Sequence, residues 1–124
     1  MSFRSPTASV NLSPEDIRQI LIDHHSVLVP HFTTQSGAYT TSGAVGHEYV
    51  LTSGSSPQTI SLHASPKEGQ RVTVKRGGTG AVTVDTDGAE TIDGGASVSL
   101  ATQYDTQTYL CIGGQYYVVA EMVN

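Results

Sequence analysis

The chain has 124 residues, a formal net charge of −5 and a pI near 5.3, which is the length of one domain with an acidic balance. Lys and Arg together number six and form no basic stripe, so nucleic acid and anionic membrane surfaces are not expected as partners. The single cysteine, Cys111, excludes an internal disulfide and any metal site built on several thiolates, and its apolar surroundings predict a small buried side chain.

Neither a membrane span nor a signal peptide is indicated. No apolar run approaches the ~20 residues that cross a bilayer. The N-terminus lacks the apolar stretch of a secretory signal, so we expect synthesis in a cytoplasm.

The N-terminal part, residues 1–45, is predicted to be an extended arm with one short helix. Ser13 can cap a helix, Pro14 suits its first position, and two acids follow at the positive end of the helix dipole. Ile17, Ile20 and Leu21 then form one apolar stripe, and the helix should end near residues 23–25. Because so short a helix is marginal alone, it must dock on something. Residues 33–46 are rich in Thr, Ser, Gly and Ala, which is typical of a linker or an extended connection.

Residues 46–124 carry a regular β pattern. Apolar and polar residues alternate, which predicts strands with one packed face and one solvated face, and Val72, Val74, Val82, Val84 and Ile92 are expected inside. The predicted strands are residues 48–52, 58–63, 70–75, 81–85, 90–92, 97–101, 106–112 and 116–121. The fold class is therefore all-β, a small antiparallel sandwich, jelly roll or barrel.

Turn residues separate these strands. Gly113-Gly114 predicts a hairpin, and so does the run from Gly77 to Gly80. Asp87-Gly88 and Asp93-Gly94 are expected to supply left-handed backbone positions for tight turns.

The stretches "EYVLTSG", "QTISLHASPKEGQRVTVKRGGTGAVTVDTDGAETIDGGASVSL" and "YLCIGGQYYVVAE" resemble a small β-domain of tailed-bacteriophage fibre, spike and head-decoration proteins. The resemblance covers about two-thirds of the chain. Tyr stands in the last strand where many members of that family have Trp. The resemblance implies a homotrimer. The chain has no long shaft of repeats, and an arm with one knob favours capsid decoration or a short head fibre.

The polar side chains of the sequence do not indicate catalytic or metal chemistry. His24, His25 and His31 match no ligand spacing, and helix-end histidines facing water are the favoured interpretation. The run from Asp85 to Glu90 lacks the register of a calcium loop and predicts a surface turn. A glycosidase would need two carboxylates across a groove, which Asp85, Asp87, Glu90 and Asp93 in turns do not suggest. Ser61 and His63 occur without a nucleophile elbow. No catalytic residue, metal or cofactor is predicted.

The expected function is that of a structural virion protein, a capsid decoration or short head fibre. The expected partners are further copies of the chain and the major capsid protein or another virion component, and the arm would contact the particle through Ile17, Ile20, Leu21, Val27, Leu28, Val29 and Phe32. Tyr104, Tyr116 and Tyr117 are candidate exposed interface aromatics. The alternative is a tail fibre or spike tip whose knob binds a host receptor or surface glycan.

Overall fold

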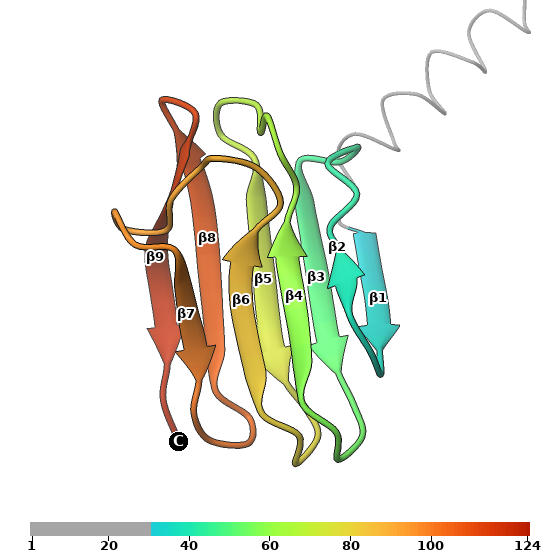
Figure 1. Ribbon diagram of the computed structural model, residues 1–124. Coiled ribbons are helices and arrows are strands. Elements are labelled where there is room, and N and C mark those ends of the chain that lie inside the picture. Colours follow the sequence, from blue (N-terminus) through green and yellow to red (C-terminus); the bar gives the residue numbers. More distant parts are fainter. Residues whose placement is uncertain (1–30) are drawn as a thin grey trace, which may run out of the picture.

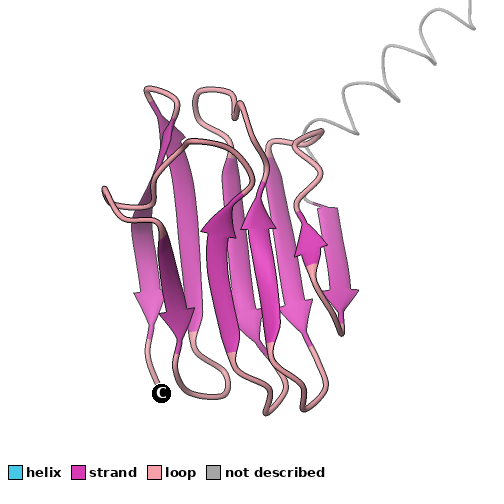
Figure 2. Cartoon of the chain, viewed as in Figure 1, coloured by secondary structure: helices cyan, strands magenta, loops and turns pink. Residues whose placement is uncertain are grey.

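Nine strands in two facing sheets make up the computed structural model, which describes residues 31–124 (Figures 1 and 2). Along the chain the strands are β1 (His31–Gln35), β2 (Tyr39–Thr40), β3 (His47–Thr52), β4 (Gln58–Leu62), β5 (Arg71–Arg76), β6 (Val82–Thr86), β7 (Ser97–Leu100), β8 (Thr106–Ile112) and β9 (Gln115–Met122). Sheet A has the order β1-β3-β5-β8-β9, and sheet B has the order β2-β4-β6-β7. Residues 31–124 include no helix of the length and hydrophobicity that crossing a membrane requires. The all-β class is confirmed for this part of the chain; the helix expected over residues 13–25 lies outside it.

The first six strands form a parallel stack rather than antiparallel pairs. The chain passes from one sheet to the other at every strand, so β1, β3 and β5 lie side by side in sheet A and β2, β4 and β6 in sheet B. His47 pairs with Arg71 in sheet A and Gln58 pairs with Val82 in sheet B, so one circuit takes 24 residues in both sheets. The antiparallel strands β7, β8 and β9 close the far end.

The core lies between the two sheets and is formed by every second residue of the strands. Val72, Val74, Val82 and Val84 are all at most 1% exposed, as the alternation predicted, and so is Ile92. The other buried apolar side chains are Val50, Ile60, Leu62, Leu100, Tyr109, Cys111 and Tyr116. Removal of this apolar surface from water is the main stabilising contribution that the sequence pattern encodes.

Because β1 to β6 pair in parallel, the prediction of an antiparallel sandwich or jelly roll is wrong for these strands. The run from Gly77 to Gly80 is not a hairpin, because β5 and β6 lie in different sheets. It forms an arch that stacks on the preceding arch at residues 53–57. A Cβ atom on Gly78 would lie 2.2 Å from the carbonyl oxygen of Gly54, and one on Gly80 would lie 2.1 Å from that of Ser56. The glycines allow the two arches to approach at the spacing of adjacent strands.

Other turn and linker predictions had mixed outcomes. The Gly113-Gly114 hairpin is confirmed, since it joins β8 directly to β9 with both glycines in the left-handed region. Asp93 and Gly94 adopt positive φ as expected, whereas Gly88 does not. Residues 90–92 form no strand; Ile92 makes isolated bridges to Gly95 and Tyr116.

Residues 33–46 are not a simple linker. β1 pairs along its whole length with β3, and β2 pairs with β4, so the β-structure begins before the boundary expected at residue 46. A buried polar cluster fixes the loop that follows β2. The Oγ1 atom of Thr41 lies 2.6 Å from Nδ1 of His63, and Gln70 donates to the carbonyl oxygens of Gly43 and Val45. These contacts satisfy polar groups that would be costly to bury alone.

Candidate interaction surface

The two outer faces of the sandwich differ sharply in chemistry. On sheet B the outward positions alternate with the buried ones and carry short hydroxyl side chains and one acid. They are Thr40, Thr59, Ser61, Thr83, Asp85, Ser97 and Ser99. Ser61 donates to Asp85 at 2.6 Å, so part of this face satisfies its own hydrogen bonds. Such a surface is already well solvated and gains little from being covered by an apolar partner.

The outer face of sheet A carries large apolar and aromatic side chains on both sides of the central strand β5, whose own outward residues are polar. Its large outward side chains come from four of the five strands, and several are strongly exposed: Phe32 is 69% exposed, Leu51 42% and Met122 61%. Tyr49, Leu110 and Tyr117 also point outward from this sheet, since their neighbours Val50, Tyr109 and Tyr116 face the core. Large exposed apolar side chains gathered on one face mark interaction sites in soluble proteins.

Charge on this face is of one sign. The outward positions of sheet A include Arg71 and Lys75. Glu48 points into the core, where it accepts from the Tyr39 hydroxyl at 2.5 Å and from the Ser42 amide at 2.8 Å. Glu121 alternates with Met122 and lies on the other side of β9. The described face of sheet A therefore presents cations without carboxylates, although the chain as a whole is acidic.

A row of stacked rings organises the β1–β3 end of this face. The Phe32 and Tyr49 ring centroids are 4.9 Å apart, and those of His47 and Tyr49 are 4.2 Å apart. Nε2 of His47 lies 2.8 Å from Oγ1 of Thr73, which is also within 2.8 Å of Oγ1 of Thr108. Partial burial, and secondarily the Arg71 charge, lower the pKa of His47, which favours the neutral imidazole here.

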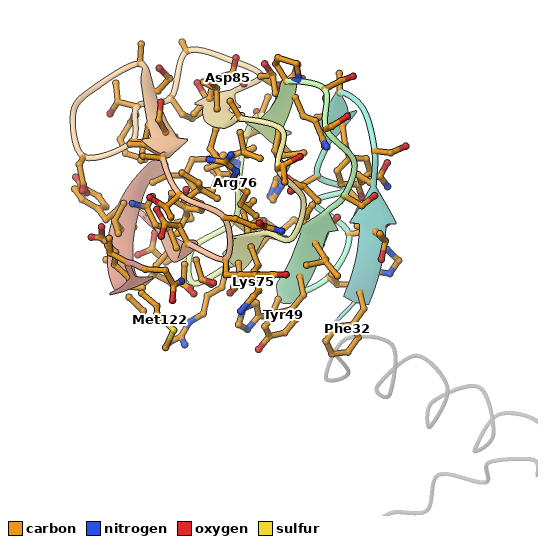
Figure 3. The ribbon with its side chains drawn as sticks, turned by 90° about the horizontal axis from the view of Figure 1, so that it is seen from below. Phe32, Tyr49, Lys75, Arg76, Asp85 and Met122 are labelled. Carbon is orange, nitrogen blue, oxygen red and sulfur yellow. The ribbon has the colours of Figure 1, made fainter. Side chains whose placement is uncertain are left out.

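A groove of about 560 Å³ runs across the same face. Its lining includes Phe32, Thr34, Tyr49, Leu51, Thr73, Lys75, Thr106 and Met122. Figure 3 shows Phe32, Tyr49, Lys75 and Met122 along one side of the sandwich, whereas Asp85 lies on the opposite side and Arg76 between the sheets. The Arg76 guanidinium is held there by the carbonyl oxygens of Leu100 and Thr79. Lys75 is thus the charged group of an otherwise apolar and hydroxylated groove.

The residues predicted to form interaction sites fall into four groups. Phe32 lies on β1 at the edge of the groove, while the other six arm residues, from Ile17 to Val29, lie outside the described residues. Tyr104 is 51% exposed and Tyr117 41% exposed. Tyr116 is a correction: it is fully buried, and its hydroxyl donates to the His63 carbonyl oxygen at 2.7 Å. In a run of two tyrosines on one strand only one can face outward, and the register of β9 assigns that position to Tyr117.

Sequence reasoning missed Tyr49, Leu51 and Met122 as surface residues. A signal was present in β3, where the acid Glu48 occupies an inward position between outward His47 and Tyr49. When the outward side chains of a strand are as apolar as the inward ones, both faces of the strand are expected to pack against other residues or a partner.

Five of the side chains that could serve catalysis or metal binding have hydrogen-bond partners within the fold: Ser61, His63, Asp85, Glu90 and Asp93. Ser61 pairs with Asp85 on the outer face, whereas His63 is buried and contacts Thr41 and Gln70, so Ser61 and His63 do not meet. Glu90 accepts from the Ser65 amide, and Asp93 accepts from the Val118 amide. Within residues 31–124 no three His, Cys, Asp or Glu side chains gather closely enough to hold a metal ion. His31 belongs to β1, and His24 and His25 lie outside this range.

No protein-family model matches the chain, and no curated protein matches it either.

Proposed function

We propose that the protein is a structural component of a bacteriophage particle, a capsid decoration or short head fibre. Its N-terminal arm would anchor it to the major capsid protein or to another virion component, and it would act as a homotrimer. The role is one of binding rather than catalysis.

The observation that carries this proposal is the apolar outer face of sheet A. The face combines exposed rings, aliphatic side chains and a groove, and these are features of protein–protein interfaces, which are enriched in aromatic residues and Met at their centres. The hydroxylated face of sheet B offers no comparable apolar area. A protein with exposed apolar side chains on one face and hydroxyl groups on the other is suited to bind neighbouring subunits in a larger assembly through the first face.

Oligomerisation would strengthen anchoring without any new contact. When several weak arms are joined by one assembled knob, each later arm binds intramolecularly, and the avidity can exceed the single affinity by about 10²–10⁴. This gain depends on whether all arms can reach their sites at once.

The test is incorporation into particles. A chain lacking residues 1–30 retains all nine described strands and should no longer join particles when it is supplied during assembly. In the full chain, Ile17→Asp combined with Leu21→Asp should have the same effect, whereas Gln19→Asp, off the apolar stripe, should not. Normal incorporation of both the truncated and the doubly substituted chain would contradict the anchoring role.

A second candidate is a tip that binds a host receptor or glycan. It is favoured by Tyr104, which is half exposed, adopts a positive φ of 74° and lies with its ring 5.8 Å from the Lys75 ammonium. A non-glycine residue in that conformation is often held for function. Tyr104→Ala should then reduce host adsorption or glycan-array binding, while a decoration protein would show neither activity before or after the substitution.

A further inference from the structure

The groove on sheet A is lined by exposed apolar side chains of the described residues. We propose that, in the free protein, residues 13–25 dock as an amphipathic helix on the outer face of sheet A. This docking is a property of the isolated chain and does not depend on the anchoring role proposed above.

Complementary apolar surfaces are the first argument. The arm segment carries Ile17, Ile20 and Leu21 at helical spacing, and a helix of this length is marginal in water unless that stripe is covered. The sheet A groove is lined by Phe32, Leu51 and other apolar groups that are exposed in the described residues. Insertion of an apolar helix face into an apolar groove is an established mode of recognition, and it removes both surfaces from water together.

Charge is the second argument. Residues 13–25 contain three acids and one Arg, so this segment is net negative. The face of sheet A presents Arg71 and Lys75 and, on the described strands, no outward carboxylate. A second copy of the same face would bring like charges together, whereas the arm brings opposite ones.

Reach is the third argument. Residues 26–30 connect the segment to β1 and span at most about 17 Å when extended. Phe32, two residues further on, already lines the groove. Five strands about 4.8 Å apart make a face roughly 19 Å across, and a 13-residue helix is about 20 Å long, so the segment can lie within the face that its own tether reaches.

The short tether favours the chain's own arm over that of another copy. Such a tether gives an effective concentration on the order of 1 mM. A contact with a dissociation constant of about 0.1 mM would then be about nine-tenths occupied within one chain, but hardly occupied between chains at about 10 μM. The contact can therefore be weak enough for a particle surface to displace it.

Amide hydrogen exchange on the full chain tests this directly. At about 10 μM, the amides of residues 17–22 should exchange at least about 10-fold more slowly than in an unstructured peptide, because an undocked helix of this length gives little protection. Raising the concentration to about 100 μM should leave this protection unchanged.

Substitutions on the two faces identify the docking site. Leu51→Glu places an acid in the groove, and it should bring the exchange of residues 17–22 to within about 2-fold of the unstructured rate. Lys75→Glu, at an exposed position, should weaken protection in the same direction and serves if Leu51→Glu does not fold. Thr59→Glu on the outer face of sheet B is the matched control and should leave protection intact.

Three results would overturn the proposal: no protection in the unaltered chain, protection that both sheet A variants leave unchanged, or protection that appears only at the higher concentration. The last result would assign the groove to a second copy. None of these measurements involves particles, so a failure of the anchoring role would appear separately, as normal incorporation of the arm variants.

Discussion

The stacked arches make Gly80, like Gly78, one of the two glycines of the described structure with the closest backbone neighbours. A methyl group there would lie 2.1 Å from the Ser56 carbonyl oxygen, well inside van der Waals contact, and that neighbour is backbone, which cannot rotate away. Gly80 does not need a left-handed backbone, so the whole cost of Gly80→Ala is the separation of two arches.

The free-energy cost of Gly80→Ala follows from the displacement of the two arches that the added methyl group requires. Relief of the clash requires a shift of about 1 Å, which breaks the 3.0 Å hydrogen bond from the Gly80 amide to the Gly54 carbonyl oxygen. Overpacking of this kind costs about 1–3 kcal/mol, and the lost hydrogen bond about 1 kcal/mol more. We expect Gly80→Ala to lower the free energy of unfolding by about 2–4 kcal/mol, which for a domain of this size lowers Tm by roughly 10–25 °C.

Urea denaturation followed by tyrosine fluorescence or circular dichroism measures the change. Gly37→Ala is the matched control, because a Cβ there meets nothing within 4 Å and its φ is not positive. That control should be neutral or stabilising by up to about 1 kcal/mol. If Gly80→Ala and Gly37→Ala differ by less than about 0.5 kcal/mol, the two arches are not stacked as described and the parallel arrangement of β3 to β6 is called into question.

Three further outcomes follow from buried polar and ionisable groups. Cys111 is fully buried and burial raises its thiol pKa, so it should react with Ellman's reagent only as fast as the domain unfolds; prompt stoichiometric reaction in the native state would contradict its placement. Burial, together with the hydrogen bond and charge of Glu48, raises the pKa of Tyr39 from 10.0 to about 12. The stabilisation that it contributes is therefore complete below pH 10 and is lost as the pH rises towards 12. Tyr39→Phe should flatten this alkaline loss in urea titrations, and an unchanged pH profile would be the contrary result. Tyr116→Phe removes the partner of the His63 carbonyl oxygen and should cost about 1–2 kcal/mol by the same urea assay; a neutral effect would mean that this oxygen has another donor.

The amino-acid sequence determined which side chains are buried in the regular strands. Period-two alternation placed Val72, Val74, Val82 and Val84 inside, because a strand must turn alternate residues to opposite faces whatever it pairs with. The Gly113-Gly114 hairpin also followed from local sequence, because two residues with left-handed backbone between apolar runs reverse the direction of the chain.

Strand direction was decided by tertiary structure. Alternation is the same in parallel and antiparallel pairs, so the sequence of β5 and β6 could not distinguish a hairpin from an arch between sheets. The 24-residue circuit is accompanied by little sequence repetition. The identical pairs at equivalent positions include Val50 and Val74, Gly54 and Gly78, and Thr59 and Thr83.

The candidate interaction surface also depended on tertiary contacts. Phe32 and Tyr49 become one stacked unit only because β1 pairs in register with β3, and Met122 joins them only through the order of sheet A. The choice between Tyr116 and Tyr117 rested on the register of β9, since a shift of one residue exchanges the two faces of a strand. Where large apolar side chains stand on both faces of a strand, as in β9, local sequence does not decide which face meets the core, and pairing between distant segments does.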